Sequence, residues 1–387
     1  MTRSAEQQHH GTAVVLAVGD IGPDRDDAGE LFEPTRELLR AADITFGQLE
    51  FVLAESGERL PQVRHTVKGD PAAARALADS GFDVISFAGN HCMDFGARAM
   101  LETITNLRAA HLHPVGVGAN IDEARQPAVL PASGGEVSVL SYSSILPHSF
   151  WATENRPGCA PMRAFTVYEQ VEHDQPGTPA RIHTFAHRDD LAALRADIAR
   201  QKSAGRFVIA SFHWGIHFIP AEIADYQRDV ARAAVDAGAD IVIGHHSHIL
   251  KGIEIYKGVP IFYSLANFAM DTRITPEHVA SKSFQEILAL NPEWVPNYES
   301  TFNFPPDSRK TIIAKFVITN GRLTDYGFFP GWINDNSQTE QIAPSDPRFA
   351  DVVDYMTTVT RQAGLSTEFR TDGDFVRPEA VSAQAQS

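Results

Sequence analysis

Short apolar segments alternate with longer amphipathic segments along most of the chain. The short ones are brief, rich in β-branched residues and bounded by Gly, Pro or Asp, which is typical of buried strands. They are Ala13–Val18, Val84–Ala88, Val137–Tyr142, Phe207–Phe212, Ile241–Ile243 and Ile261–Leu265. The longer ones repeat apolar residues every three or four positions and predict helices over Pro71–Ser80, Ala97–Ala110, Asp189–Ser203 and Ala221–Ala237. This alternation predicts a layered α/β domain.

Two segments interrupt the alternation. Residues 146–187 are rich in Pro, Gly and polar side chains and predict a loop or small insertion, and residues 272–310 are aromatic and proline-rich, as expected of a lid or insertion. Residues 311–370 then predict a hairpin around Asn320-Gly321 and a helix that completes the fold. The polar residues 371–387 predict a flexible tail.

Composition excludes several classes of protein. The 387 residues contain 33 Lys and Arg against 49 Asp and Glu, a net charge of −16, which disfavours binding to nucleic acid or to anionic membranes. Two cysteines fit a reducing compartment, and no signal peptide, membrane anchor or membrane-spanning segment is evident. We therefore expect a soluble, cytoplasmic protein. Sixteen histidines, five of them between His213 and His248, are the unusual feature.

Polar side chains follow four of the predicted strands. Asp20 comes after the first strand, Asn90 and His91 after the second, His213 after the fourth, and His246 and His248 after the fifth. Because ligands bind at the carboxyl ends of strands in α/β sheets, these loops should meet at one edge. Carboxylate, amide and imidazole groups suit divalent zinc, manganese or iron.

Several of these residues also have a purely structural interpretation. Asp20 could cap a turn, Glu50 could be solvated, and an isolated His-x-His pair is more often a solvated loop than a metal site. Asp94 could orient His91 or cap the following helix with equal odds. His245 either packs beneath the site or orients a ligand.

Four segments together carry a family resemblance. They are Gly81–Gly96, His213–Gly215, Gly238–His248 and Gly258–Phe268, which contain Gly-Asn-His-Cys-Met-Asp, His-Trp-Gly, Gly-His-His-Ser-His and Leu-Ala-Asn-Phe. In this order they resemble the poly-γ-glutamate capsule biosynthesis (CapA) family of the calcineurin-like metallophosphoesterase superfamily. The resemblance implies a four-layer α/β/β/α sandwich over residues 12–271 and a centre of two divalent metal ions.

The resemblance also implies roles for individual residues. The metal ligands would be Asp20, Glu50, Asn90, His213, His246 and His248, with His91 assisting catalysis beside Asp94. Gln48, His217, His245 and Asn267 would lie next to the ligands or the substrate. Gln48 and His217 depart from the family, which has Asn and Glu at these positions, and Asp20 lacks the histidine that usually follows two residues later.

Such a site predicts metal-assisted hydrolysis of an amide, ester or phosphoester in a small metabolite or a polyglutamyl, peptide-like substrate. The alternative is a non-catalytic component of poly-γ-glutamate capsule synthesis or export. A third interpretation is a protein that binds metal without catalysis.

Overall fold

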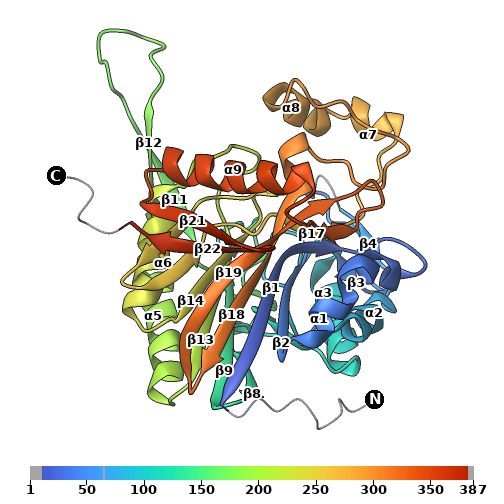
Figure 1. Cartoon of the computed structure of the whole chain (residues 1–387). Coiled ribbons are helices and arrows are strands. Elements are labelled where there is room, and N and C mark those ends of the chain that lie inside the picture. Colours follow the sequence, from blue (N-terminus) through green and yellow to red (C-terminus); the bar gives the residue numbers. More distant parts are fainter. Residues whose placement is uncertain (1–10, 64–65, 382–387) are drawn as a thin grey trace, which may run out of the picture.

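Two β-sheets packed face to face form the centre of the molecule in this computed structural model, which describes residues 11–63 and 66–381 (Figure 1). The larger sheet has the strand order β21-β22-β19-β18-β1-β2-β5-β6, with β17 beside β1 and β20 beside β19. Its strands are β1 (Thr12–Gly22), β2 (Ile44–Leu49), β5 (Val84–Ser86), β6 (His113–Val115), β17 (Asn267–Met270), β18 (Lys310–Thr319), β19 (Arg322–Ile333), β20 (Thr339–Gln341), β21 (Thr367–Asp372) and β22 (Phe375–Ala380).

The second sheet has the order β15-β16-β14-β13-β9-β8. Its strands are β8 (Ala128–Ala132), β9 (Gly135–Ser143), β13 (Phe207–His213), β14 (Ile241–His245), β15 (Ile253–Tyr256) and β16 (Val259–Phe262). Apolar side chains alternate along these strands and interdigitate with those of the larger sheet, for example Val15 and Phe46 with Ile209 and Ile243. This buried layer is the main core.

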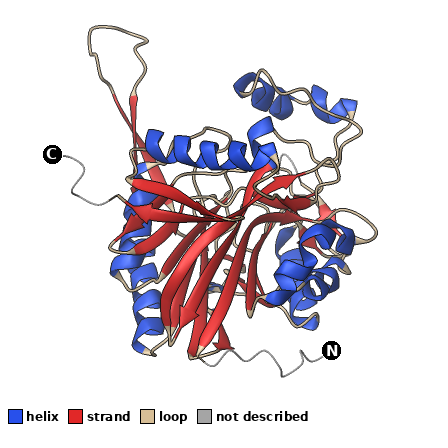
Figure 2. Cartoon of the chain, in the orientation of Figure 1, coloured by secondary structure: helices blue, strands red, loops and turns tan. Residues whose placement is uncertain are grey.

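Helices cover the outer face of each sheet (Figure 2). The larger sheet packs against α1 (Arg36–Ala41), α2 (Ala73–Ser80) and α3 (Gly96–Ala109), and the smaller sheet packs against α5 (Arg188–Ser203) and α6 (Asp225–Asp236). The predicted four-layer α/β/β/α sandwich is therefore confirmed. None of the helices in the described residues combines the length and the hydrophobicity that a bilayer span requires.

Shorter elements connect these layers. They are η1 (Ala28–Thr35), β3 (Val52–Leu53), β4 (Lys68–Gly69), β7 (Val117–Gly118), α4 (Ile121–Ala124), β10 (Gly158–Cys159), β11 (Ala164–Glu169), β12 (Arg181–Ala186), α7 (Pro276–Ala280), α8 (Lys282–Leu290) and η2 (Pro306–Arg309). Residues 146–187 contain the β11–β12 hairpin, and residues 272–310 contain α7, α8 and η2.

Several element boundaries differ from the sequence prediction, among them the end of β1, which runs on to Gly22. Helix α6 begins at Asp225 rather than Ala221, because Ala221 has a left-handed φ of 59° and Ala224 is extended. Strand β16 ends at Phe262, before Leu265.

The C-terminal region contains the largest correction. The expected hairpin forms as β18 and β19 around Asn320 and Gly321, and α9 (Pro347–Gln362) follows it. The prediction of a flexible tail over residues 371–387 is wrong for residues 371–380, which belong to β21 and β22; residues 382–387 lie outside the described range. Phe375 and Val376 anchor this hairpin by burying their side chains against β19. Two apolar residues in a polar segment are too few to predict a strand.

Candidate metal centre

The strand ends of both sheets contribute side chains to one buried cluster. Asp20 lies on β1, Glu50 directly follows β2, and Asn90 and His91 lie in the loop after β5. From the smaller sheet, His213 ends β13, while His246 and His248 lie in the turn after β14. The parallel pairing of β1 with β2 and of β13 with β14 brings these carboxyl ends together.

Asp20, Glu50 and His213 form the centre of the cluster. One potential ligand atom from each residue lies within 4.8 Å of the others, and all three side chains are buried. Nδ1 of His213 is 3.4 Å from Oε1 of Glu50. These are three of the six residues to which the family resemblance gave the role of metal ligands, and their carboxylate and imidazole groups suit a divalent cation.

Several atoms of this cluster have no hydrogen-bond partner. Within the described residues, Oδ1 of Asp20, Oε1 of Glu50 and Nδ1 of His213 are buried and unpaired. Nε2 of His213 is 2.7 Å from Oδ1 of Asn90, so it carries the proton that the amide oxygen accepts. The lone pair of Nδ1 then faces a carboxylate oxygen with no proton between them. Buried polar atoms are normally satisfied, so a bound cation fits these residues.

His246 and His248 occupy unusual backbone conformations, with φ of 90° and 55°. The backbone N–H of His246 donates to Oδ2 of Asp20 at 3.2 Å, and its ring Nδ1 lies 3.1 Å from Nε2 of His213. Left-handed backbone at non-glycine residues costs free energy and concentrates at functional sites. The strained turn places the imidazole of His246 beside His213, and Nδ1 of His248 lies 3.4 Å from Oδ2 of Asp20.

Asn267 fixes the orientation of His248. Nδ1 of His248 donates to Oδ1 of Asn267 at 2.7 Å, and the amide of Asn267 donates to the backbone carbonyl of His248 at 3.3 Å. Asn267 begins β17 and lies beside Asp20 in the sheet. Because this same Nδ1 faces Asp20, Asn267 holds the imidazole of His248 beside the carboxylate.

Burial decides the charge state of the cluster. Desolvation lowers the pKa of His213 and His246 well below the usual range, and lowers that of His248 to about 4. Burial also raises the pKa of Asp20 and of Glu50, and the charge of Asp20 raises that of Glu50 further. Neutral imidazoles are the form that binds metal. A divalent cation would favour the ionised form of both carboxyl groups.

His91 lies at the accessible edge of the cluster. Its Nδ1 is 2.6 Å from Oδ2 of Asp94, and its Nε2 is 3.9 Å from Oε2 of Glu50. Burial lowers the pKa of His91, but the hydrogen bond to Asp94 and the neighbouring carboxylates outweigh it and raise the pKa to about 9. Helix α3 has no side-chain cap, so Asp94 orients His91 and does not cap the helix.

The residues expected beside the ligands differ in position. Gln48 is buried and donates to the carbonyls of Leu49 and Ala88. His245 lies beneath the cluster between the sheets, where its Nε2 donates to the carbonyl of Val18 at 3.2 Å. His217 instead lies at the surface, with its ring centroid 3.9 Å from that of His246 and 5.2 Å from that of His248.

An aromatic wall extends from His217 over this side of the cluster, and we define it as His217, Phe218 and Phe304. The ring of Phe218 is 5.2 Å from that of His217, and the ring of Phe304 is 4.8 Å from that of His248. The sequence analysis grouped Phe304 with the aromatic segment 272–310 but did not identify Phe218. Phe218 directly follows His217 in the sequence, and this proximity to a candidate site residue could have identified it.

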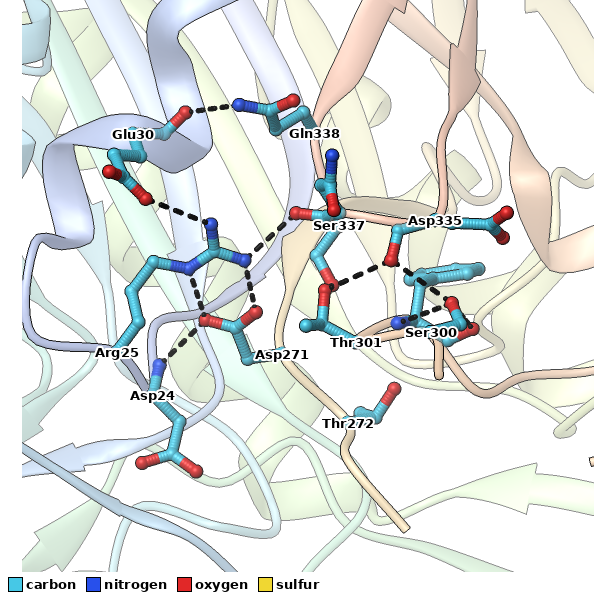
Figure 3. Close-up of polar contacts among 12 residues, drawn as sticks. Asp24, Arg25, Glu30, Asp271, Thr272, Ser300, Thr301, Asp335, Ser337 and Gln338 are labelled. Atoms are coloured by element: carbon cyan, nitrogen blue, oxygen red, sulfur yellow. Dashed lines mark hydrogen bonds and ion pairs between the residues drawn. The ribbon is translucent and has the colours of Figure 1, made fainter. Parts of the chain in front are cut away.

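A polar clamp joins the start of the aromatic segment and its residues 300–301 to the loop after β1 and to residues 335–338 (Figure 3). Asp271, which directly follows β17, accepts hydrogen bonds from the backbone N–H of Asp24 and from the guanidinium of Arg25. Arg25 also donates to the carbonyl of Asn336 at 2.8 Å. The hydroxyl of Thr301 donates to the carbonyl of Asp335, which joins residues 300–304 to the same loop. The clamp therefore connects the loop after β1, β17 and the aromatic segment.

Comparison with known proteins identifies the family. Residues 5–272 match the model of the family described as "Bacterial capsule synthesis protein PGA_cap", which is more than half of the chain. The chain belongs to this capsule synthesis family. All of the candidate ligands lie within the matched residues, whereas strands β18 to β22 and helix α9 lie beyond them.

Individual relatives have names that refer to polymer synthesis. "PGA biosynthesis protein CapA" of Bacillus subtilis is 29% identical over 63% of this chain and 57% of its own length. "Capsule biosynthesis protein CapA" of Bacillus anthracis is 28% identical over 62% and 54%. A "Probable polyglutamine synthesis accessory protein" of Mycobacterium tuberculosis is 28% identical over 65% and 61%. The matched part of this chain thus spans little more than half of the curated relatives.

Proposed function

We propose that this member of the capsule synthesis family is a metal-dependent hydrolase that acts on an amide, ester or phosphoester bond. The observation that supports the proposal is the set of unpaired buried atoms on Asp20, Glu50 and His213. Two buried carboxylate oxygens and one imidazole nitrogen without hydrogen-bond partners are costly to fold unless a cation binds them.

Two divalent ions of manganese, zinc or iron fit the available donors. Asp20, Glu50, Asn90, His213, His246 and His248 would together hold them. When bound, such ions lower the pKa of water and stabilise negative charge that develops on the attacked group. The chain supplies the ligands, their orientation and a largely buried environment.

His91 is the proposed proton donor to the leaving atom. Asp94 fixes its Nδ1, which leaves Nε2 on the side of Glu50 and the cluster. A histidine oriented in this way can protonate a departing oxygen or nitrogen. Of the site residues, the carboxylate of Asp94 hydrogen-bonds to His91 alone, so its role is to position the imidazole.

The substrate is proposed to be a small molecule or a polyglutamyl, peptide-like chain that carries carboxylates. A cavity of about 540 Å³ lies at the loops after β1, β3 and β17, and it is lined by three cations, Arg25, Lys68 and Arg273, and by four carboxylates, Asp24, Asp26, Glu55 and Asp70. Cations in such a cavity would bind substrate carboxylates. The aromatic wall would contact the apolar part of the substrate on the other side.

A second candidate function is that of a non-catalytic component of polymer synthesis. The printed names of the relatives, which include "accessory protein", favour it. In that case the cluster would serve the stability of the fold or its partner binding.

Two measurements distinguish these functions. The protein is first titrated with Mn²⁺, Zn²⁺ and Fe²⁺, and bound metal is counted by inductively coupled plasma mass spectrometry. The metal-loaded protein is then assayed in parallel against phosphomonoesters, phosphodiesters, peptides and γ-glutamyl peptides, together with the double variant His91→Ala, His246→Ala. The exposed His173→Ala is the matched control.

A hydrolase should bind at least one equivalent of metal and hydrolyse one substrate class, and the double variant should lose this activity but keep its fold. His173→Ala should retain it. Less than one equivalent in every preparation would refute the metal centre. Metal binding without hydrolysis of any class would favour the accessory function.

The aromatic wall gives a separate prediction. Phe304→Ala removes the ring that packs on His248, so we expect KM to rise severalfold for substrates with an apolar group next to the cleaved bond. The bound metal content should stay unchanged, because Phe304 offers no ligand atom. An unchanged KM would show that the wall does not contact the substrate.

A further inference from the structure

The β11–β12 hairpin projects away from the body of the molecule (Figures 1 and 2). Six of the nine large hydrophobic side chains that the described residues expose lie on it or in its loop: Phe165, Val167, Tyr168, Val171, Ile182 and Phe185. Tyr168 is 70% exposed and Phe165 52%. Such a concentration of exposed apolar surface marks an interaction site.

Apolar side chains cover both faces of the hairpin. Phe165 lies opposite Phe185, with ring centroids 6.1 Å apart, and Tyr168 lies opposite Ile182. Because side chains alternate between the faces of a strand, the phenylalanine pair and the Tyr168–Ile182 pair lie on opposite faces. A hairpin that packed one face on its own domain would have a polar outer face.

One edge of this hairpin is open. The outer edge of β12 is tied to the start of α6, where the backbone N–H of Thr184 donates to Asp225 and that of Tyr226 donates to the hydroxyl of Thr184, both at 3.1 Å. Among the described residues, β11 pairs with β12 alone. Its sequence, Ala-Phe-Thr-Val-Tyr before Glu169, contains none of the charges or prolines that protect an edge strand from pairing.

The hairpin is also short of stabilising contacts. A two-stranded hairpin is at best marginally stable in water, and further strands are needed for independent stability. The exposed parts of its six apolar side chains amount to about 500–600 Å² per chain, taking about 150–250 Å² for each fully exposed aromatic residue. Pairing of two β11 edges would satisfy the open backbone groups of both copies and bring the side chains of each β11 beside those of the other.

We propose that the β11 strands of two copies of this chain pair antiparallel and form a four-stranded sheet across a two-fold axis. A strand without charges is self-complementary in this arrangement, and a two-fold axis closes the assembly. The stem is neutral, because Glu169 is paired with Arg181 at 3.2 Å and contacts His183. In a chain of net charge −16, a neutral surface is where two copies repel each other least.

The mass of the full-length protein in solution tests this proposal. Analytical ultracentrifugation should give twice the chain mass of 42.4 kDa. Val167→Lys and Phe165→Lys should each weaken the dimer at least about tenfold, because a lysine on an edge strand disfavours pairing and the lysines of the two copies would repel each other across the new strand pair. Val295→Lys is the matched control, since Val295 is an apolar side chain that is 81% exposed on another segment.

A cross-link identifies the paired edge independently of these variants. Thr166→Cys lies in the middle of β11, and the two native cysteines, Cys92 and Cys159, are buried. Mild oxidation should therefore produce a covalent dimer through residue 166. In the same protein, thermal unfolding confirms that the fold is intact.

Three results would overturn the proposal. They are a wild-type protein that is monomeric at micromolar concentration, a dimer that persists in both lysine variants, and a folded Thr166→Cys protein without cross-link. A monomer that binds phospholipid vesicles through this hairpin would assign the surface to a membrane instead.

Discussion

Replacement of Glu50 by Gln separates two effects of the buried carboxylates, namely the free energy that they cost in the metal-free fold and their contribution to metal binding. Glu50 is buried, its Oε1 has no hydrogen-bond partner among the described residues, and its ligand atom lies at most 4.8 Å from that of Asp20. At an effective dielectric constant of about 20, two charges at that distance repel each other by about 3 kcal/mol. The metal-free protein reduces this cost by protonation, so we expect Glu50→Gln to stabilise it by about 1–3 kcal/mol.

The same substitution has the opposite effect when metal is present. A ligand at 100 times its dissociation constant stabilises the native state by about 2.7 kcal/mol, and an amide is a much weaker ligand than a carboxylate. Metal should therefore raise the Tm of the wild type but hardly that of Glu50→Gln. The order of stability of the two proteins reverses between chelator and saturating metal.

The dependence on pH provides a second measurement on the same proteins. Burial and the charge of Asp20 raise the pKa of Glu50 above its ordinary value of 4.5. Between pH 4.5 and the raised pKa of Glu50 in the folded state, the folded metal-free protein binds more protons than the unfolded one, so its stability falls as pH rises. Glu50→Gln should show a smaller decrease.

Urea unfolding and thermal scans, with chelator and with metal, measure both effects. The control is Glu254→Gln, a buried carboxylate that is paired with Arg232 at 2.7 Å. It should destabilise the protein in both conditions. The reasoning is refuted if metal-free Glu50→Gln is less stable than the wild type and metal stabilises both equally.

Two further predictions concern groups outside the ligand set. Arg25→Met leaves the fully buried carboxylate of Asp271 without its cation and should destabilise the protein by about 3–5 kcal/mol in urea unfolding, whereas Arg75→Met at the exposed surface should cost less than about 1 kcal/mol. An equal cost for both variants would contradict the role of the clamp. Burial lowers the pKa of Lys251 from 10.5 to about 8, so the unfolded chain holds its proton more tightly and stability should gain up to about 3 kcal/mol between pH 8 and 10.5. Lys251→Met should lack this gain, measured as the difference in unfolding free energy between pH 7.5 and 10, and an identical pH dependence of the two proteins would refute it.

The local sequence determined the layered core and most of the elements. Strands such as Phe207–Phe212 and the helix that ends at Gly81 follow from hydrophobic periodicity and capping, which act between neighbouring residues. The polar residues after the strands also indicated the candidate metal centre, because parallel strands present their carboxyl ends at one edge. Asp20 and His246 could therefore be named as candidates before their contact was known.

Tertiary structure decided what depends on residues far apart in the chain. Phe375 and Val376 form a strand because β19 offers a place to bury them, and Arg25 meets Asp271 across 246 positions. The lone pair of His213 facing Glu50 likewise exists only after the two sheets pack. Local sequence patterns reflect the propensities of neighbouring residues. The unpaired atoms of a site and the open edge of a hairpin depend instead on whether the fold brings a distant segment beside them.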